Sequence, residues 1–450
     1  MKKALITGIA GQDAGHLAKF LHEKGYKVYG TVRGQLESTH PRYQKLKNEF
    51  PYVELIMADL QDLAVLTRTM QEVEPDEVYN LAAISHVGYS FKDSILTADV
   101  TAKGVLNMLE AIRLAGLEKS IRFYQASTSE MFGGLDYNRP QKGYNEESAF
   151  HPRSPYGVSK LFGHWITKNY RETYGMYCCS GILFNHEGER RGPEFVTRKI
   201  SKAVARIKLN KQDVLELGNM DSWRDWGYAG DYIEGMWLML QQNEPDDYVL
   251  ATGEAHSIRE FCELAFKEIG IQLKWRGKGI KEVGYDAANN KTLIKVNPDF
   301  FRPAEVDILL GDPTKAETKL GWKRKVDFEG LVSLMVKHDL AEESELLYAG
   351  YSSEGPLRHI VFFVIKEKVT DKELLEFINK ADALIKKTKG VIKYNVNQSM
   401  DVRKGRIVIL NAVFDNIEDF ESYRKLPKHT EFAAEASKIS DWFNGDYLEQ

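Results

Sequence analysis

The sequence begins with a short apolar segment, a glycine turn and an amphipathic segment, in that order. Residues 4–6 have the character of a buried strand, and residues 14–23 place apolar side chains on one face of a helix. Between them, Gly8, Gly11 and Ala14 follow the spacing of a dinucleotide-binding turn, with Ala in the third place. Small residues allow a tight turn, and the helix N-terminus then faces a pyrophosphate. At the start of a strand–helix–strand pattern, this turn predicts a nucleotide-binding parallel sheet.

Strand and helix patterns alternate over the first half of the chain, which predicts an α/β fold with a doubly wound parallel sheet of the Rossmann type. Further strands are expected at 27–32, 53–57, 77–81, 122–126 and 177–184, and a long helix at 156–174. The pattern then loosens, and residues 187–340 are expected to form a smaller substrate-binding lobe within a first domain, 1–341. The polar stretch 342–355 is expected to be a linker.

The remaining residues, 356–450, are expected to form a separate α+β domain. Strands are expected at 358–365, 391–397 and 406–413, and helices at 371–387 and 417–425. A chain of 450 residues is too long for one ordinary core, so more than one domain is expected.

The composition is that of a soluble globular protein, with 43% hydrophobic and 28% charged residues. A net charge of −4 gives no reason to expect a nucleic-acid partner. Three Cys are too few for a disulfide framework and suit a reducing compartment. We see no apolar stretch long enough for a signal peptide or a membrane helix. We therefore expect a cytoplasmic protein without a membrane partner or a bound metal.

Three further segments are expected to complete the cofactor site. Arg33 follows the second strand, where an NAD enzyme carries Asp or Glu, and a guanidinium there suits the 2′-phosphate of NADP. The alternative is an ordinary exposed arginine. Asp59-Leu60 would meet the adenine, and the small residues of Leu81-Ala82-Ala83 let the cofactor approach the backbone. The cofactor residues predicted in this way are Gly8, Ile9, Ala10, Gly11, Gln12, Asp13, Arg33, Asp59, Leu60, Leu81, Ala82 and Ala83.

A tyrosine and a lysine four residues apart are the first catalytic candidates. This spacing is common by chance, as Tyr43 and Lys47 illustrate, but Tyr156 and Lys160 lie on a helix that begins at Ser154-Pro155. Both side chains then share one face of that helix. The lysine ammonium and a nicotinamide cation are expected to lower the pKa of the phenol, so that it accepts a hydroxyl proton as hydride leaves.

Thr128 and Glu130 end the strand that precedes this helix. In an extended segment they face the same way, because side chains two residues apart share a face. A carboxylate beside a ketone made by oxidation is placed to remove an acidic α-proton. The alternative is an exposed loop carboxylate, but beside Tyr156 the catalytic interpretation is favoured.

These segments belong to a longer series of motifs that resembles the GDP-mannose 4,6-dehydratase family of extended short-chain dehydrogenases/reductases. The motifs, over about three quarters of the chain, are Tyr124–Gly133, Pro152–Tyr156, Gly181–Glu187, Phe195–Ile200, Asp225–Gly227, Phe301–Val306 and Gly311–Ala316. The resemblance implies conversion of GDP-D-mannose to GDP-4-keto-6-deoxy-D-mannose and water, with NADP as an internally recycled oxidant.

The resemblance also implies a role for each matching residue. Tyr156 would take the proton of the mannose 4-hydroxyl, Glu130 would remove the proton from carbon 5 and help to expel the 6-hydroxyl, and Thr128 would bind the oxygen at carbon 4. Lys160 would hold the cofactor ribose. Further cofactor contacts would come from Tyr156, Ser85, His186 and Arg191. The nucleotide sugar would be held by Ser85, Glu130, Asn185, Lys199, Arg224, Arg302 and Glu305.

Three departures from the family bear on substrate and assembly. Arg33-Gly34 replaces two adjacent arginines of a loop that helps to build the family's tetramer, and Leu96 replaces a cofactor-contacting tyrosine. The stretch 133–156, beside the sugar pocket, is longer than usual. An alternative substrate is therefore another nucleotide sugar, such as a GDP-heptose.

The C-terminal domain resembles the dimeric α/β-barrel (Dabb, stress-responsive A/B barrel) family, a ferredoxin-like fold in which two sheets pair. His359 and His429 are candidates for a second pocket, although ordinary core or rim histidines are the more frequent case. The resemblance implies a homo-oligomer, a dimer or a tetramer, with dimerisation as the expected role of this domain.

Two other functions compete with the dehydratase. An epimerase or reductase of the same superfamily would not need Glu130 beside Thr128. A non-catalytic NADP-binding protein that recruits a partner through its barrel would not need Tyr156 and Lys160 either.

Overall fold

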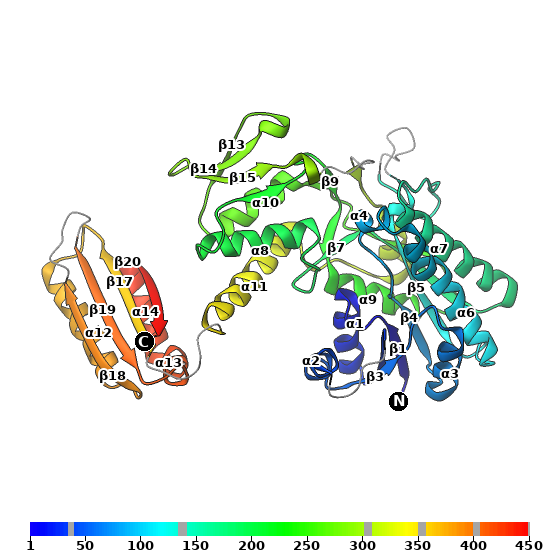
Figure 1. Cartoon of the computed structure of the whole chain (residues 1–450), viewed down its shortest axis with the longest axis horizontal. Helices are drawn as coiled ribbons and strands as arrows, with labels where there is room; N and C mark the ends of the chain where they lie inside the picture. Colours follow the sequence, from blue (N-terminus) through cyan, green and yellow to red (C-terminus); the bar gives the residue numbers. More distant parts are fainter. Residues whose placement is uncertain (35–39, 134–141, 301–307, 350–356, 399–405, 449–450) are drawn as a thin grey trace. The chain divides into compact units, whose positions relative to one another are not determined.

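The computed structural model describes residues 1–34, 40–133, 142–300, 308–349, 357–398 and 406–448. The chain divides into two compact units, Met1–Glu343 and Ser344–Gln450 (Figure 1). Each unit has its own hydrophobic core, and each is described by itself below.

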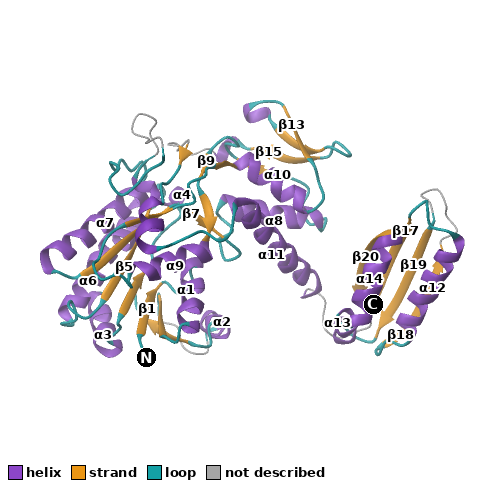
Figure 2. Cartoon of the chain, turned by 180° about the vertical axis from the view of Figure 1, so that it is seen from behind, coloured by secondary structure: helices purple, strands orange, loops and turns teal. Residues whose placement is uncertain are grey.

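A seven-stranded parallel sheet is the centre of the first unit (Figure 2). Its strands, in spatial order, are β11 (Tyr248–Leu250), β6 (Tyr177–Leu183), β5 (Arg122–Thr128), β4 (Glu77–Asn80), β1 (Lys3–Thr7), β2 (Lys27–Val32) and β3 (Val53–Met57). The strand order reverses between β1 and β4, as it does in a doubly wound sheet, and ligands bind such sheets outside the carboxyl ends of the strands. The predicted Rossmann-type sheet is confirmed.

Helices cover both faces of this sheet, which explains why its strands are buried on both sides. One face packs against α1 (Gln12–Glu23), α2 (Pro41–Glu49) and α9 (Ala229–Met239). The other face packs against α3 (Leu63–Val73), α6 (Gly104–Leu114) and α7 (Pro155–Tyr174). Between β4 and α6 the chain forms α4 (Val87–Ser90), α5 (Ser94–Ala98) and a π-helical turn, η1 (Asp99–Lys103).

The rest of the first unit forms a lobe with its own core of apolar side chains. Its helices are α8 (Val196–Lys208), α10 (Ile258–Glu268) and α11 (Phe328–Ala349). Its strands are β13 (Leu273–Arg276), β14 (Val283–Asp286), β15 (Thr292–Val296) and β8 (Leu215–Leu217) in one sheet, β12 (His256–Ser257), β9 (Trp223–Arg224) and β16 (Ile308–Leu309) in a second, and β10 (Trp226–Tyr228) with β7 (Asn185–Glu187) in a third.

Helix α11 extends into the expected linker, because residues 342–349 continue this helix. Polar side chains there were expected to mark a linker, but Glu342 and Glu343 form ion pairs with Arg198 and Arg206 of α8. The charges therefore hold a helix in place. Residues 350–355 lie outside the described part of the chain.

The second unit is a four-stranded antiparallel sheet with helices packed on it. Its strands, in spatial order, are β18 (Val391–Gln398), β19 (Ile407–Phe414), β17 (Leu357–Ile365) and β20 (Ser440–Leu448). Its helices are α12 (Asp371–Lys386), α13 (Ile417–Arg424) and α14 (Pro427–Ile439). The sequence analysis predicted β17, β18, β19, α12 and α13, but not α14 and β20. Among the described residues, no helix is both long and apolar enough to cross a membrane.

Candidate active site

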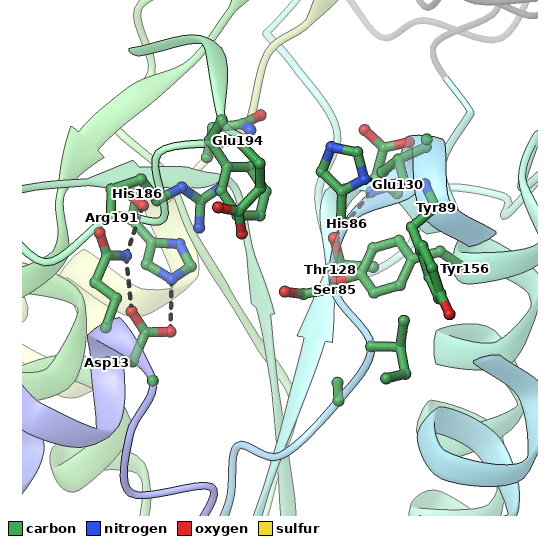
Figure 3. A pocket seen from close by; sticks show the side chains of 18 of the residues that line it. Asp13, Ser85, His86, Tyr89, Thr128, Glu130, Tyr156, His186, Arg191 and Glu194 are labelled. Carbon is green, nitrogen blue, oxygen red and sulfur yellow. Dashed lines mark hydrogen bonds and ion pairs between the residues drawn. The ribbon is translucent and has the colours of Figure 1, made fainter. Parts of the chain in front are cut away.

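A cavity of about 1310 Å³ lies at the carboxyl edge of the seven-stranded sheet (Figure 3). Small-molecule sites typically measure about 300–1,000 Å³, so this one has room for more than one drug-sized ligand. Almost all of the predicted site residues line it, namely Gly8, Ala10, Gly11, Gln12, Asp13, Arg33, Asp59, Leu60, Leu81, Ala82, Ala83, Ser85, Thr128, Glu130, Tyr156, Lys160, Asn185, His186, Arg191, Lys199 and Arg224.

The glycine turn between β1 and α1 forms the floor of the cavity at one end. Gly8 has a left-handed backbone (φ +71°), and a Cβ there would lie 3.0 Å from the Cα of Ala82 on the next strand end. The amide of Gly11 donates to the carbonyl of Gly8 at 2.9 Å and closes the turn. Ile9 departs from the expectation, because its side chain is fully buried and packs in the core, away from the cavity. Its backbone amide bonds to Thr31 instead of facing a ligand.

Two side chains at the start of α1 connect the glycine turn to β7. His186 Nε2 lies 2.8 Å from Asp13 Oδ2, and Gln12 Nε2 donates to the carbonyl of His186 at 3.0 Å. Burial alone would raise the pKa of Asp13, but His186, Gln12 and Arg191 outweigh it and hold this pKa at about 2. Burial also works against the charged form of His186, yet Asp13 raises the pKa of that imidazole. The pair is therefore stabilised in its charged form.

The ends of β2, β3 and β4 complete this half of the cavity. Arg33 is exposed and lines the cavity directly after β2, as expected for a group that meets a charged ligand. Asp59-Leu60 follows β3, and Leu81-Ala82-Ala83 and Ser85 follow β4. These residues share one side of the cavity because the carboxyl ends of parallel strands meet at one edge of the sheet.

Thr128 and Glu130 lie where β5 ends, but not in the expected conformation. The strand stops at Thr128, and Glu130 belongs to a single 3₁₀ turn, Ser129–Met131. The Thr128 hydroxyl accepts a hydrogen bond from the amide of Glu130 at 3.3 Å, which turns the backbone. The two side chains still line one cavity, so the turn rather than an extended strand brings them together.

Tyr156 is the second residue of α7, whose start is fixed by Ser154. The Ser154 hydroxyl accepts from the amide of Gly157 at 3.0 Å, and Pro155 occupies the first helical position. A Cβ at Gly157 would lie 3.0 Å from the carbonyl oxygen of Glu130. The absence of a side chain at this position therefore lets the helix approach the Glu130 turn closely.

The pKa of Tyr156 moves in the opposite direction from the one expected. Burial raises it to about 12, the Thr128 hydroxyl works against this rise, and the charge of Glu130 adds to it. Lys160 does not offset the rise, because its Nζ lies 5.9 Å from the phenol ring centre and donates to the carbonyl of Ala126 at 2.7 Å. Burial lowers the pKa of Lys160 itself to about 8. A further positive charge is needed in the cavity for the phenol to ionise near neutral pH.

The other end of the cavity carries the residues that were expected to hold a nucleotide sugar. Asn185 comes from β7, Lys199 from α8 and Arg224 from β9. Lys199 Nζ lies 3.6 Å from the ring centre of Phe300, and burial lowers the pKa of this lysine. The predicted substrate residues Arg302 and Glu305 lie outside the described residues.

Several residues that line the cavity were not predicted as site residues from the sequence. They are chiefly His86, Tyr89, Glu194, Phe195, Asn219 and Phe300. In Figure 3, His86 and Tyr89 appear on the same side of the cavity as Glu130 and Tyr156, and Glu194 on the side of Arg191. His86 follows Ser85 directly at the end of β4, so its position beyond a strand end was the available signal. The loop residues carried no such signal, because their approach to the cavity depends on the lobe.

The cavity has unsatisfied groups that suit a polar ligand. Gln12 Oε1 and Asn185 Oδ1 are buried and accept no hydrogen bond from any described residue. Buried polar atoms normally have partners, so these two point to a ligand that supplies donors. Together with the close-packed glycine turn, they fit a dinucleotide at one end and a polar substrate at the other.

Comparisons with known proteins agree with this geometry. Residues 5–335 match the family described as GDP-mannose 4,6 dehydratase, and residues 357–447 match the stress responsive A/B barrel domain. The GDP-mannose 4,6-dehydratase of Yersinia enterocolitica is 49% identical over 359 residues, which cover 77% of this chain and 95% of that protein. The human GDP-mannose 4,6 dehydratase is 49% identical over 342 residues, 75% of this chain and 91% of that protein.

Solved structures share the fold of the first unit. The RMD protein of Pseudomonas aeruginosa, complexed with NADPH, superposes with a TM-score of 0.60 over 76% of this chain and 100% of that one, at 22% identity. The dTDP-glucose 4,6-dehydratase DesIV of Streptomyces venezuelae, with NAD and TYD bound, gives a TM-score of 0.62 over 76% and 98% of the two chains, at 21% identity.

Proposed function

The chain belongs to the GDP-mannose 4,6-dehydratase family, and from this membership we propose that it converts GDP-D-mannose to GDP-4-keto-6-deoxy-D-mannose and water. The observation that carries the proposal is the convergence of Thr128, Glu130, Tyr156 and Lys160 on one cavity with a dinucleotide turn. An oxidoreductase that only oxidises or epimerises a sugar has no use for Glu130 in that place.

NADP is the proposed cofactor, held by the glycine turn, the strand ends and Arg33. When bound, it supplies an acceptor for the hydride of carbon 4 and returns that hydride to carbon 6. The exposed guanidinium of Arg33 in the cavity supports a 2′-phosphate partner. Asp13 and His186 neutralise each other, so Asp13 adds little repulsion towards a pyrophosphate.

Tyr156 and Thr128 act on the oxygen at carbon 4. Tyr156 accepts the proton of the 4-hydroxyl as the carbon–hydrogen bond breaks, and the Thr128 hydroxyl holds the oxygen in place. Because the pKa of Tyr156 is about 12 in the protein alone, the positive charge of the nicotinamide ring must lower it. Proton transfer by Tyr156 is therefore coupled to an occupied cofactor site.

Glu130 acts on the neighbouring carbon. The 4-ketone acidifies the proton at carbon 5, and the carboxylate removes it and passes it to the 6-hydroxyl, which leaves as water. As hydride returns to carbon 6, the proton that Tyr156 took from the 4-hydroxyl is returned to carbon 5 and completes the product. The half-buried position of Glu130 on a 3₁₀ turn supports this role, since its backbone is fixed while its carboxylate faces the cavity.

The nucleotide part of the substrate is proposed to lie against the lobe, beside β7, α8 and β9. Lys199 and Arg224 supply positive charge for the diphosphate, and Asn185 supplies an unpartnered carbonyl oxygen for a hydroxyl. Arg302 and Glu305 are proposed for the same site on the family motif that contains them.

Mass spectrometry of the product formed from GDP-mannose without added NADPH tests the proposal. Loss of one water is the expected result. An unchanged mass with altered stereochemistry would indicate an epimerase, and no reaction would favour the non-catalytic alternative. A parallel assay with a GDP-heptose, compared by kcat/KM, tests the alternative sugar.

The C-terminal unit is proposed to join two copies of the chain. Alternate residues of β17 are buried under helices, while Ile360 and Val364, together with Ile409 of β19, are half-buried on the other face. Pairing two such faces would remove apolar surface from water, at roughly 25 cal/mol per Å². The packing of His359 against Phe420 and Tyr423 supports a core role for this histidine. We also propose that residues 1–341 form the first domain of the chain and residues 356–450 the second.

A further inference from the structure

A line of buried hydrogen bonds joins the glycine turn to Lys160 across three strands of the sheet. Thr7 Oγ1 donates to Asn80 Oδ1 at 2.8 Å, and Asn80 Nδ2 donates to Gln125 Oε1 at 2.8 Å. Gln125 Nε2 donates to the carbonyl oxygen of Ala126 at 3.0 Å. The same oxygen accepts from Lys160 Nζ at 2.7 Å. The side chains of this line come from β1, β4, β5 and α7.

The direction of these bonds is set at the Thr7 end. The Thr7 hydroxyl accepts from the amides of Leu81 and Ala82, both at 3.0 Å, so its single proton is left for Asn80. An oxygen of Asn80 that accepts this proton turns its NH₂ group towards Gln125, and the same argument turns the NH₂ group of Gln125 towards Ala126. Rotation of either amide would place two donors or two acceptors face to face in a buried site.

Because these side chains are buried, breaking any of the hydrogen bonds between them costs free energy. Thr7, Asn80 and Gln125 expose at most 1% of their surface. A buried polar group that loses its partner costs about 1–3 kcal/mol. The Gln125 amide is therefore held firmly in one orientation, with its NH₂ group on the Ala126 oxygen.

The position of the Lys160 ammonium depends on its hydrogen bond to the Ala126 carbonyl oxygen. The Ala126 carbonyl is its only hydrogen-bond acceptor among the described residues, and the side chain is 5% exposed. The ammonium has three donors, so one is used here and two remain for the cavity. Gln125 and Lys160 share one acceptor, and the position and dipole of the Gln125 amide therefore act directly on the ammonium.

We propose that Gln125 is a positioning residue, which fixes the Lys160 ammonium through the shared Ala126 carbonyl and thereby sets the orientation and the acidity of this group towards the cofactor. The proposal rests on the function proposed above for the site. Gln125 itself touches neither cofactor nor substrate, since it does not line the cavity.

Two substitutions of Gln125 change the hydrogen bond at the Ala126 oxygen, and they favour the charged form of Lys160 to different degrees. Gln125→Met keeps the length of the side chain but removes the donor, so the Ala126 oxygen is left to Lys160 alone and binds the ammonium more strongly. Gln125→Glu keeps the shape and the acceptor for Asn80 but replaces the donor to the Ala126 oxygen with a carboxylate oxygen. The contact between these two oxygens is offset only by the ammonium beside them. Both favour the charged lysine, the second more than the first. The matched control is Tyr124→Phe, because the Tyr124 hydroxyl is buried on the same strand and bonds to no described residue.

The measurement is the affinity for NADP⁺ between about pH 6 and pH 10, by titration calorimetry, together with turnover of GDP-mannose and the thermal unfolding of the cofactor-free chain. Because burial puts the pKa of Lys160 at about 8, wild-type affinity is expected to fall above that pH. Gln125→Glu should move this alkaline limb upward by about one to two pH units, and Gln125→Met by less. In Gln125→Met, kcat should fall by about tenfold, because the Gln125 amide no longer fixes the direction from which the Ala126 oxygen binds the ammonium.

A lower unfolding temperature with an unmoved alkaline limb in both variants would overturn the proposal, since it would leave Gln125 a merely structural role. So would a limb that moves equally in Tyr124→Phe. If Gln125→Met does not fold, the isosteric Gln125→Glu variant decides alone. The NADP⁺ titrations need no sugar, so a wild-type protein that leaves GDP-mannose unchanged would refute the proposed function without affecting this test.

Discussion

Replacing Glu130 by Gln removes a carboxylate from the cavity while keeping the length and shape of the side chain. The Glu130 carboxylate hydrogen-bonds to no residue that the structure describes, and the Thr128 hydroxyl is bound by the backbone amide, which the substitution leaves in place. We therefore expect the free energy of unfolding to change by less than about 0.5 kcal/mol. Loss of a general base slows a reaction by about 10²–10⁴-fold, which is the expected loss of dehydration.

The first oxidation should survive in the same variant. The negative charge of Glu130 contributes to the raised pKa of Tyr156, after the larger effect of burial. Removing a unit charge from the same cavity, at an effective dielectric constant of about 20, lowers a neighbour's pKa by about one to two units. Tyr156 should thus accept the 4-hydroxyl proton at least as readily as in the wild type. Oxidised sugar and reduced cofactor should then accumulate together.

Stopped-flow absorbance of the reduced nicotinamide, followed by mass spectrometry of the quenched sugar, measures both steps in one experiment. Glu130→Gln should give a lasting absorbance rise without loss of water, whereas the wild type should give little or none. Tyr156→Phe is the matched control and should give neither signal. Wild-type dehydration in Glu130→Gln, or the absence of any reduced cofactor, would refute the roles assigned to these residues.

The remaining predictions concern the hydride, the charged pair and the assembly. Deuterium at carbon 4 of GDP-mannose should reappear at carbon 6 of the product by NMR, and its complete loss to solvent would contradict internal transfer. His186→Asn should weaken NADP⁺ binding by about ten- to hundredfold, because Asp13 keeps its charge without the imidazolium that bonds to it, and unchanged affinity would exclude this role. Since the folded protein raises the pKa of His186 and lowers that of Asp13 to about 2, the pair's contribution to stability is full between about pH 4 and pH 6.5. It is lost as pH rises through the raised pKa of His186 or falls through the pKa of Asp13, which denaturation at several pH values measures. Residues 1–349 alone should form a smaller assembly than the full chain in light scattering, and equal sizes would remove the dimerisation role of the C-terminal unit.

Local patterns in the sequence were sufficient for much of the fold. The strand of residues 4–6, the turn at Gly8 and Gly11 and the helix begun by Ser154-Pro155 are all encoded within short windows, because apolar period, small residues and capping act over a few positions. The places of Arg33 and Asp59 beside the cavity follow from the rule that parallel strands end at one edge. In contrast, α14 and β20 were not anticipated, and the expected linker proved to begin within α11, where charges on α8 decide the outcome.

Within the site, the sequence by itself determined which chemical groups are present, since Thr128, Glu130, Tyr156 and Lys160 are read directly from their motifs. Only the tertiary structure decided the pKa values and the hydrogen-bond partners of these groups. The raised pKa of Tyr156 comes from burial, the Lys160 ammonium is held by a carbonyl 34 residues away, and His186 meets Asp13 across 173 residues. Desolvation and long-range hydrogen bonds depend on which atoms surround a group after folding, and no short stretch of sequence contains that information.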